Sequence, residues 1–187
     1  MTIDDELEQL KQDVRYLRDR ADIVDCIARH ARGHDRHDVE LITSTYHEDG
    51  VDEHGFAVNA GPQYAAWANA QHASSSASHL HNVTTHLCEL DGDVAICESY
   101  VMVVLLSPDA RSTTIMNGRY VDRLERRDGV WRIAVRRSTV DAVITGDATM
   151  LGHPFFKQQG YIKGTRDHGD ISYQRPVTLD GPEPARW

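Results

Sequence analysis

The feature that most constrains the fold is a run of about sixty residues in which the hydrophobic pattern alternates. Strands are predicted over residues 79–90, 94–106, 112–126 and 130–141, separated by short segments rich in Asp, Gly, Ser and Pro. Short connections join antiparallel neighbours, so the four segments predict an antiparallel meander. Helical patterns come before this run and do not alternate with it. The order predicts an α+β fold.

The segment before the strands predicts three helices. The first, from residue 4 to about 32, is long and amphipathic, and Gly33 is expected to end it. Shorter helices are expected over residues 39–46, with Asp38 as the cap, and over residues 63–73. The first helix could pack on the sheet or form a short coiled coil between subunits, because one face carries an apolar stripe: Leu7, Leu10, Val14, Leu17, Ala21 and Val24.

The remaining segments predict turns, one hairpin and a tail. His47–Gly50 has the composition of a turn, and residues 51–58 predict a short hairpin bent near Gly55. From Gly152 onward the chain is irregular in pattern and rich in Gly, Pro and charge. We therefore expect a domain over residues 1–151 and a C-terminal tail, residues 152–187, which wraps the domain or a neighbouring subunit.

Charge and composition exclude several classes of function. The 20 Lys and Arg residues against 29 Asp and Glu give a net charge of −9, which disfavours binding to nucleic acid or anionic membranes. The N-terminus lacks the pattern of a secretory signal, and no apolar run approaches the ~20 residues that span a bilayer. Three dispersed cysteines, Cys26, Cys88 and Cys97, indicate reduced thiols. A cytoplasmic protein is expected.

Histidine is the residue type that points to chemistry, with 11 in the chain. Side chains alternate along a strand, so His79 and His81 share one face, and His86 faces the other way if no bulge intervenes. His30 and Asp35, at the end of the first helix, could point into the same cavity. A solvated turn around Asp35 is the alternative.

Arg136 is the basic residue that these patterns single out. By strand alternation it shares a face with Arg132, Ala134 and Ser138, opposite Trp131. An arginine flanked by small residues indicates a partly polar, concave interior, and an exposed basic face is the alternative.

Several of these residues together resemble a known family. The chain combines a long first helix with Asp35 at its end, a short second helix, and a histidine that leads into a strand. The segments LDGDVA at 90–95 and ERRDGVWRI at 125–133 follow. This order resembles the SnoaL-like branch of the nuclear transport factor 2-like superfamily over roughly residues 5–142. The resemblance implies a cone-shaped, strongly curved antiparallel sheet, closed by N-terminal helices around a pocket.

The resemblance also implies roles for individual residues. Asp35, in the segment GHDR, matches the catalytic aspartate of the family, and His81, in SHLHN, matches its catalytic histidine. Arg136 matches a pocket arginine of the dehydrochlorinases. His30 takes the place of a pocket tyrosine or lysine, and His54 falls near a pocket tyrosine of the scytalone dehydratases.

The implied activity is that of a cofactor-independent lyase or isomerase of the dehydratase, dehydrohalogenase or cyclase type. Its substrate would be a hydrophobic, cyclic small molecule. His81 would take a proton from carbon while Asp35 orients the ring, and Arg136 would stabilise the anion that forms. His30 or His54 would polarise the leaving oxygen. No cofactor and no metal are expected.

Further residues are expected to bind the substrate around this group: Tyr46, His54, His79, Met102 and Met116. The apolar helix stripe and the outer face of the sheet both need covering, which favours a homodimer or homotrimer.

Two other functions stay open. The fold could serve as a binding or scaffold module, as in the β subunits of ring-hydroxylating dioxygenases. Histidine pairs could instead hold a metal ion, either His79 with His81 or His34 with His37, although their spacing matches no established metal motif.

Overall fold

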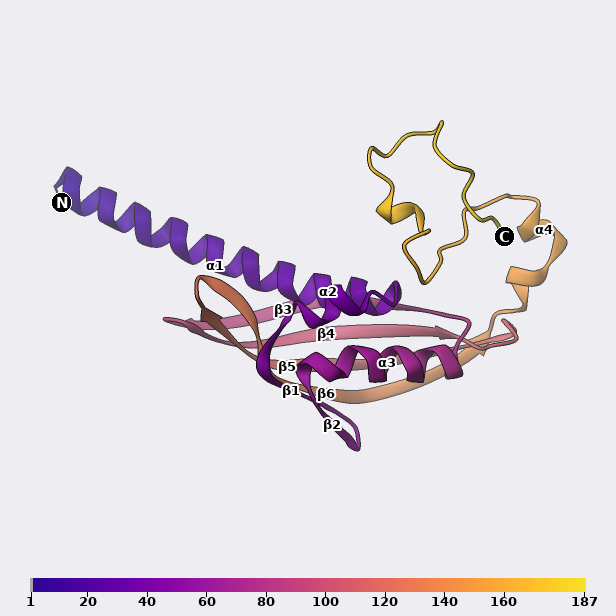
Figure 1. Ribbon diagram of the computed structural model, residues 1–187, viewed down its shortest axis with the longest axis horizontal. Coiled ribbons are helices and arrows are strands. Elements are labelled where there is room, and N and C mark those ends of the chain that lie inside the picture. The colour runs from indigo at the N-terminus through magenta and orange to yellow at the C-terminus, as the bar shows by residue number, and fades with distance from the viewer. Residues whose placement is uncertain (1) are drawn as a thin grey trace.

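The computed structural model describes residues 2–187 and contains one six-stranded sheet with the long helix and α3 packed on it (Figure 1). The sheet order is β2-β1-β6-β5-β4-β3. All neighbouring strands are antiparallel except β1 and β6, which are parallel. The strands are β1 (Tyr46–His54), β2 (Ala57–Ala60), β3 (Ser78–Asp91), β4 (Val94–Leu106), β5 (Ser112–Arg127) and β6 (Val130–Asp147). The predicted α+β fold and its four-strand meander are confirmed.

The helices that cover the sheet are α1 (Ile3–Asp35), α2 (Val39–Thr43) and α3 (Gly61–Ser75). Asp38 caps α2 as expected, because its side chain accepts a hydrogen bond from the Leu41 amide. The buried core lies between these helices and the sheet, and its members include Ile23, Ile27, Ile42, Tyr64, Leu124, Trp131 and Ile133. No helix in residues 2–187 is both long enough and apolar enough to cross a membrane.

The expected end of the first helix at Gly33 is wrong, because α1 continues for two more residues to Asp35. A Cβ atom at Gly33 would lie 2.6 Å from Cγ1 of Ile42. The glycine therefore permits the close approach of α2. As a result, Asp35 lies on the last turn of α1, where its side chain can reach the sheet.

The turn expected over residues 47–50 is also wrong, since this segment belongs to β1. Its pairing with β6 shifts register between Tyr46 and Val51, which accommodates the irregular residues. A Cβ at Gly50 would lie 2.9 Å from the carbonyl oxygens of His47 and Ile133. Turn-like composition here reflects a bulged strand that lies close to its neighbour.

Two further bulges decide which side chains face the helices. In the β5–β6 pair, Leu124 is opposite Ile133 and Arg123 is opposite Val135, so Ala134 is the extra residue. The bulge places Arg136 on the same face as Ile133, contrary to the simple alternation expected from the sequence. A register shift between Val83 and His86 in β3 likewise brings His86 next to the buried Ser99.

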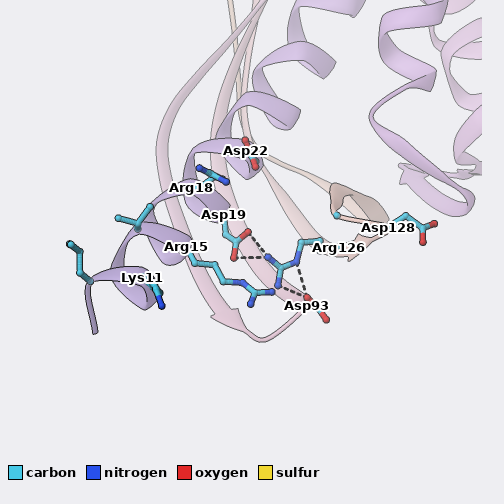
Figure 2. A pocket seen from close by; sticks show the side chains of 11 residues that line it. Lys11, Arg15, Arg18, Asp19, Asp22, Asp93, Arg126 and Asp128 are labelled. Carbon is cyan, nitrogen blue, oxygen red and sulfur yellow. Dashed lines mark hydrogen bonds and ion pairs between the residues drawn. The ribbon is translucent and has the colours of Figure 1, made fainter. Parts of the chain in front are cut away.

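Ion pairs fix the middle of α1 to the sheet. Arg126 of β5 donates to Asp19 at 2.8 Å and to Asp93 at 2.8 Å, as Figure 2 shows. The Trp131 indole also donates to Asp19. The N-terminal end of α1 extends beyond the sheet in Figure 1. Most apolar side chains before Asp19 are exposed: Ile3, Leu7, Leu10, Val14 and Leu17.

The C-terminal segment is irregular apart from three short helical turns: Thr149–Gly152, Pro154–Lys157 and Ile171–Tyr173. It contacts the helical layer through an ion pair between Asp170 and Arg36 at 3.1 Å. The Tyr173 hydroxyl donates to Asp38 at 2.7 Å. The division into a domain over residues 1–151 and a tail over residues 152–187 stays a prediction.

Candidate active site

Asp35 and His81 form a close pair between the end of α1 and the start of β3. The Nδ1 atom of His81 lies 2.8 Å from Oδ1 of Asp35. The His81 backbone amide also donates to both carboxylate oxygens, at 3.0 and 3.1 Å. The His81 side chain is only 4% exposed and that of Asp35 14%. Their separation along the chain is 46 residues, so the tertiary fold creates the pair.

This geometry selects one form of the imidazole ring. An ionised carboxylate only accepts hydrogen bonds, so Nδ1 of His81 carries the proton that Asp35 accepts. In a neutral ring, the lone pair is then on Nε2, the nitrogen that Asp35 does not contact. The arrangement can take up a proton at Nε2 and stabilise the resulting imidazolium through Asp35.

His81 lines a small cavity of about 80 Å³ over the middle of the sheet. Its apolar wall is formed by Val101, Val103, Leu105, Met116 and Val140, from β4, β5 and β6. Its polar lining consists of His54, His72, His81, Asn117, Tyr120, Ser138 and Thr139, with the Gly118 backbone between them. The cavity therefore combines an apolar wall with a few convergent polar groups, as small-molecule sites do.

Arg136 lies outside this cavity lining and is fully buried behind Tyr120. Its guanidinium carbon is 4.0 Å from the centre of the Tyr120 ring. Nε and Nη2 each donate to the Asp122 carboxylate at 2.7 Å, a bidentate pair, and Nη1 lies 2.8 Å from Nδ1 of His30. Its donors are occupied by Asp122 and His30, and only the Tyr120 ring lies between the guanidinium and the cavity lining.

His30 links Arg136 to a second buried carboxylate. Because Arg136 only donates hydrogen bonds, Nδ1 of His30 accepts and its proton is on Nε2, which lies 3.1 Å from the Tyr46 hydroxyl. Tyr46 in turn donates to Oδ2 of Asp52 at 2.6 Å. These groups form one continuous network beneath the cavity: Asp122, Arg136, His30, Tyr46 and Asp52.

The end of this network approaches the cavity at His54. Nδ1 of His54 is 3.7 Å from Oδ1 of Asp52 and 3.4 Å from the Tyr64 hydroxyl. Burial raises the pKa of Asp52 to about 6, against the lowering effect of its bond from Tyr46. Burial lowers the pKa of His54 to about 4, so its ring is neutral at pH 7.

We call the Asp35–His81 pair the dyad. Six histidine rings, one of them that of His81, contact one another in a continuous cluster: His30, His34, His37, His72, His79 and His81. Burial lowers the pKa of His72 and of His79 to about 3. It also holds the pKa of His30 and of His34 well below the ordinary value. The cluster is therefore composed largely of neutral imidazoles at pH 7.

The structure brings some of the predicted site residues to the cavity and leaves others elsewhere. His81, His54 and Met116 line it. His30 and Tyr46 lie in the buried network below. His79 is buried against His72, with Nε2 donating to the His34 carbonyl at 2.8 Å. Met102 does not line this cavity; with Thr84 and Tyr100 it lines a neighbouring hollow that neither Asp35 nor His81 lines.

Three residues important to the site were absent from the sequence prediction: His72, Tyr120 and Asp122. His72 lies on α3, where helical spacing alone does not show which face meets the cavity. Tyr120 and Asp122 alternate with Leu124 on the buried face of β5, and this pattern was the available signal. Pairing Asp122 with Arg136 also required the bulge at Ala134.

The sequence matches the SnoaL-like domain over residues 15–137, well over half of the chain and including both dyad residues. The chain belongs to the SnoaL-like domain family. No curated protein matches it.

Several solved structures are similar to this chain. A Mycobacterium tuberculosis protein of unknown function is 32% identical to this SnoaL-like protein, with 71% of this chain and 76% of that chain covered and a TM-score of 0.61. A type 2 hexachlorocyclohexane dehydrochlorinase is 21% identical, with coverage of 72% and 93% and a TM-score of 0.67. A candidate scytalone dehydratase from Novosphingobium aromaticivorans is 18% identical, with coverage of 73% and 91% and a TM-score of 0.62. The last two likenesses show the fold alone.

Proposed function

We propose that this SnoaL-like protein is a cofactor-independent lyase or isomerase that removes a proton from carbon in a small, largely apolar molecule. The observation that carries the proposal is the Asp35–His81 hydrogen bond of 2.8 Å at the edge of an apolar cavity. The bond orients the ring and leaves the other imidazole nitrogen to act as the base. The dehydrochlorinase and dehydratase among its structural relatives support an elimination.

The reaction begins when Nε2 of His81 takes a proton from a carbon atom of the substrate. The electrons of the broken C–H bond form a carbon–carbon double bond, and a hydroxyl or halide leaves the adjacent carbon with its bonding electrons. Asp35 stabilises the imidazolium that forms on His81. In an isomerisation the same proton would return to a different carbon, and no group would leave.

We assign His54 to the leaving group and Arg136 to a positioning role. His54 lines the cavity and presents an imidazole that can donate a hydrogen bond to a departing oxygen. Arg136 holds Tyr120 and His30 in place through the face of the Tyr120 ring and Nδ1 of His30, while the Asp122 carboxylate balances its charge. His30 and Tyr46 support this network from below.

The cavity limits the size of the substrate. A cavity of roughly 150 Å³ accommodates benzene, whereas this one measures about 80 Å³. A ring compound enters only if lining side chains move, and the unbranched Met116 is the side chain best suited to move. Small cyclic alcohols and halides are therefore the first substrates to test.

The proposal is tested by incubating the purified protein with a panel of hydroxylated and halogenated ring compounds without added cofactor. Mass spectrometry should show loss of water or hydrogen halide, or an isomer of unchanged mass. Conversion that requires an added nicotinamide or flavin would contradict the proposal. Tight binding without conversion across the panel would instead favour a ligand-binding protein.

A scaffold function, as in the β subunit of an oxygenase, makes a different prediction. The protein would then form a stable complex with a larger catalytic subunit, and its own cavity would carry out no reaction. Copurification with such a subunit, together with no turnover by the isolated chain, would favour the scaffold.

A further inference from the structure

His34 is the most unusual polar side chain in the molecule. It is fully buried on α1, and neither Nδ1 nor Nε2 has a hydrogen-bond partner within residues 2–187. An unpartnered buried polar group loses its bonds to water without replacing them, so native structures rarely keep one without a bound water, an ion or a functional reason. The mechanism proposed above gives His34 no role.

Two other imidazole rings lie next to His34. The ring of His81 is 5.0 Å away between ring centres and that of His72 is 5.8 Å away. One nitrogen from each of the three rings can be chosen so that all three atoms lie within 4.8 Å of one another. The three residues come from α1, α3 and β3, so the tertiary fold builds this group.

We propose that His34, His72 and His81 form a binding site for a divalent transition-metal ion of the zinc class. Imidazole nitrogen is a favoured ligand for zinc, cobalt, nickel and copper. Nδ1 of His81 is held by Asp35, so the ligand from His81 is Nε2. A carboxylate that orients a metal-binding histidine in this way is typical of metal sites in proteins.

The cavity borders the side of the metal site that the three histidines leave open. His72 and His81 both line it, so an ion held by the three rings has an open position toward the cavity for water or another small ligand. In tetrahedral coordination with Zn–N bonds of ~2.0–2.1 Å, ligand nitrogens are about 3.3 Å apart. The rings therefore draw inward by roughly 1 Å when the ion binds. Side-chain rotation of His72 can supply much of this movement.

The site has a consequence for activity, which rests on the function proposed above. Nε2 of His81 is both the proposed base and the proposed metal ligand, and one lone pair cannot serve both. The metal ion therefore inhibits the reaction by occupying the base.

Binding is tested with Co²⁺ and Zn²⁺ on untagged protein that has been dialysed against a chelator. We expect one Co²⁺ per chain, with the visible absorption of a tetrahedral cobalt site, and displacement of Co²⁺ by Zn²⁺. The His72→Gln variant should bind at least about 100-fold more weakly, because one of three protein ligands is lost. His34→Gln should do the same, and thermal unfolding without metal identifies any variant that fails to fold.

A matched control separates this site from a group of possible ligands that shares no residue with it. His86 lies near Cys88 and Cys97, which could also hold an ion. We expect His86→Gln to bind Co²⁺ as the natural protein does, without the near-ultraviolet bands of cobalt bound to thiolate. Binding that survives in folded His72→Gln, thiolate bands, or the absence of stoichiometric binding would each overturn the proposal.

The inhibition is measured separately, with a substrate that the protein converts. We expect half-maximal inhibition at the Zn²⁺ concentration that half-fills the site, and no inhibition of His72→Gln over that range. Stoichiometric binding without inhibition would uphold the metal site and contradict the role of His81 as base. Inhibition without binding at these histidines would contradict the site alone.

Discussion

At the scale of single residues, Asp35 contacts His81 in two ways that have different consequences. It accepts hydrogen bonds from the His81 backbone amide, which attaches the end of α1 to β3. It also accepts from the ring, which determines the nitrogen that faces the substrate. One carboxylate therefore has both a structural and a chemical role.

The Asp35→Asn variant separates these roles, because the amide keeps the size of the side chain but loses its charge. The imidazolium that forms during the reaction loses its partner, so we expect kcat/KM to fall by ~10²–10⁴. Steady-state kinetics measures the loss, and circular dichroism verifies the fold. Asp25→Asn, an exposed position on the same helix, should leave kcat/KM unchanged. Equal effects of the two substitutions would contradict the assignment.

Family resemblance predicted the partners Asp35 and His81, whereas local pattern alone left Asp35 as a turn residue. The histidines His34 and His72 show what could not be predicted. Their positions depend on how α1 and α3 are rotated against the sheet, which short-range spacing does not determine. Arg136 was predicted as a pocket residue, but its contacts with Asp122 depend on a single bulge residue, Ala134.

At the scale of elements, the pairing of β5 with β6 shapes the cavity. Gly118 lines the cavity at a bulge, and a Cβ atom there would lie 1.9 Å from the Thr139 carbonyl oxygen. A backbone atom cannot rotate away, so any side chain must force the strands apart.

We expect Gly118→Ala to lower the free energy of unfolding by roughly 2–4 kcal/mol, because the added methyl overpacks the strand pair. Urea denaturation measures the change. Gly146→Ala is the matched control, since its Cβ would meet only a Thr113 methyl at 3.4 Å. A loss at Gly118 no larger than at Gly146 would show that the strands separate easily.

The prediction of a homo-oligomer rests on the exposed apolar side chains in the first turns of α1. Leu10 and Leu17 are 57% and 64% exposed, and no part of the described chain covers their stripe. We expect a dimer or trimer in solution, and Leu10→Glu together with Leu17→Glu should shift it to monomer by burying charge in the contact. Light scattering after gel filtration measures the mass. Gln9→Glu, on the same helix, is the control, and a monomeric natural protein would contradict the prediction.

The helices and strands also show which element boundaries sequence patterns can predict. Alternation and turn residues predicted β3, β4 and β5 to within one residue at each end, because each hairpin is a local structure. The predicted end of β6 at residue 141 is wrong, since β6 continues to Asp147 beside the start of β5. The patterns missed β1 before residue 51, since its parallel pairing with β6 joins distant segments. Gly33 was mistaken for a helix end because close packing and a left-handed cap favour the same residue.

At the scale of the whole molecule, the buried histidines make stability depend on pH. Burial lowers the pKa of His72 and His79 to about 3 and that of His54 to about 4, whereas unfolded histidine titrates near ~6.5. Below pH ~6.5 the unfolded chain binds protons that the folded chain does not. Stability is therefore full above pH ~6.5 and is lost as pH falls toward these lower pKa values.

We expect the free energy of unfolding to decrease steadily from pH 7 to pH 5, as measured by urea denaturation at each pH. The raised pKa of Asp52 has the opposite effect on stability, because the folded state takes up that proton at a higher pH than the unfolded state does. This effect involves one proton, whereas several buried histidines contribute to the loss of stability. His72→Gln should flatten the dependence. A stability that is constant or rises over this range would contradict the burial of neutral imidazoles.

The activity of His81→Ala tests the central claim most directly. We expect this variant to remain folded and to lose ~10²–10⁴-fold in kcat on a substrate that the natural protein converts, because the base is gone. His86→Ala is the control, since His86 lies on the same strand and bonds Ser99 outside the cavity. Near-normal turnover by His81→Ala would contradict the account, whereas a loss confined to His81→Ala would establish the dyad as the proton acceptor.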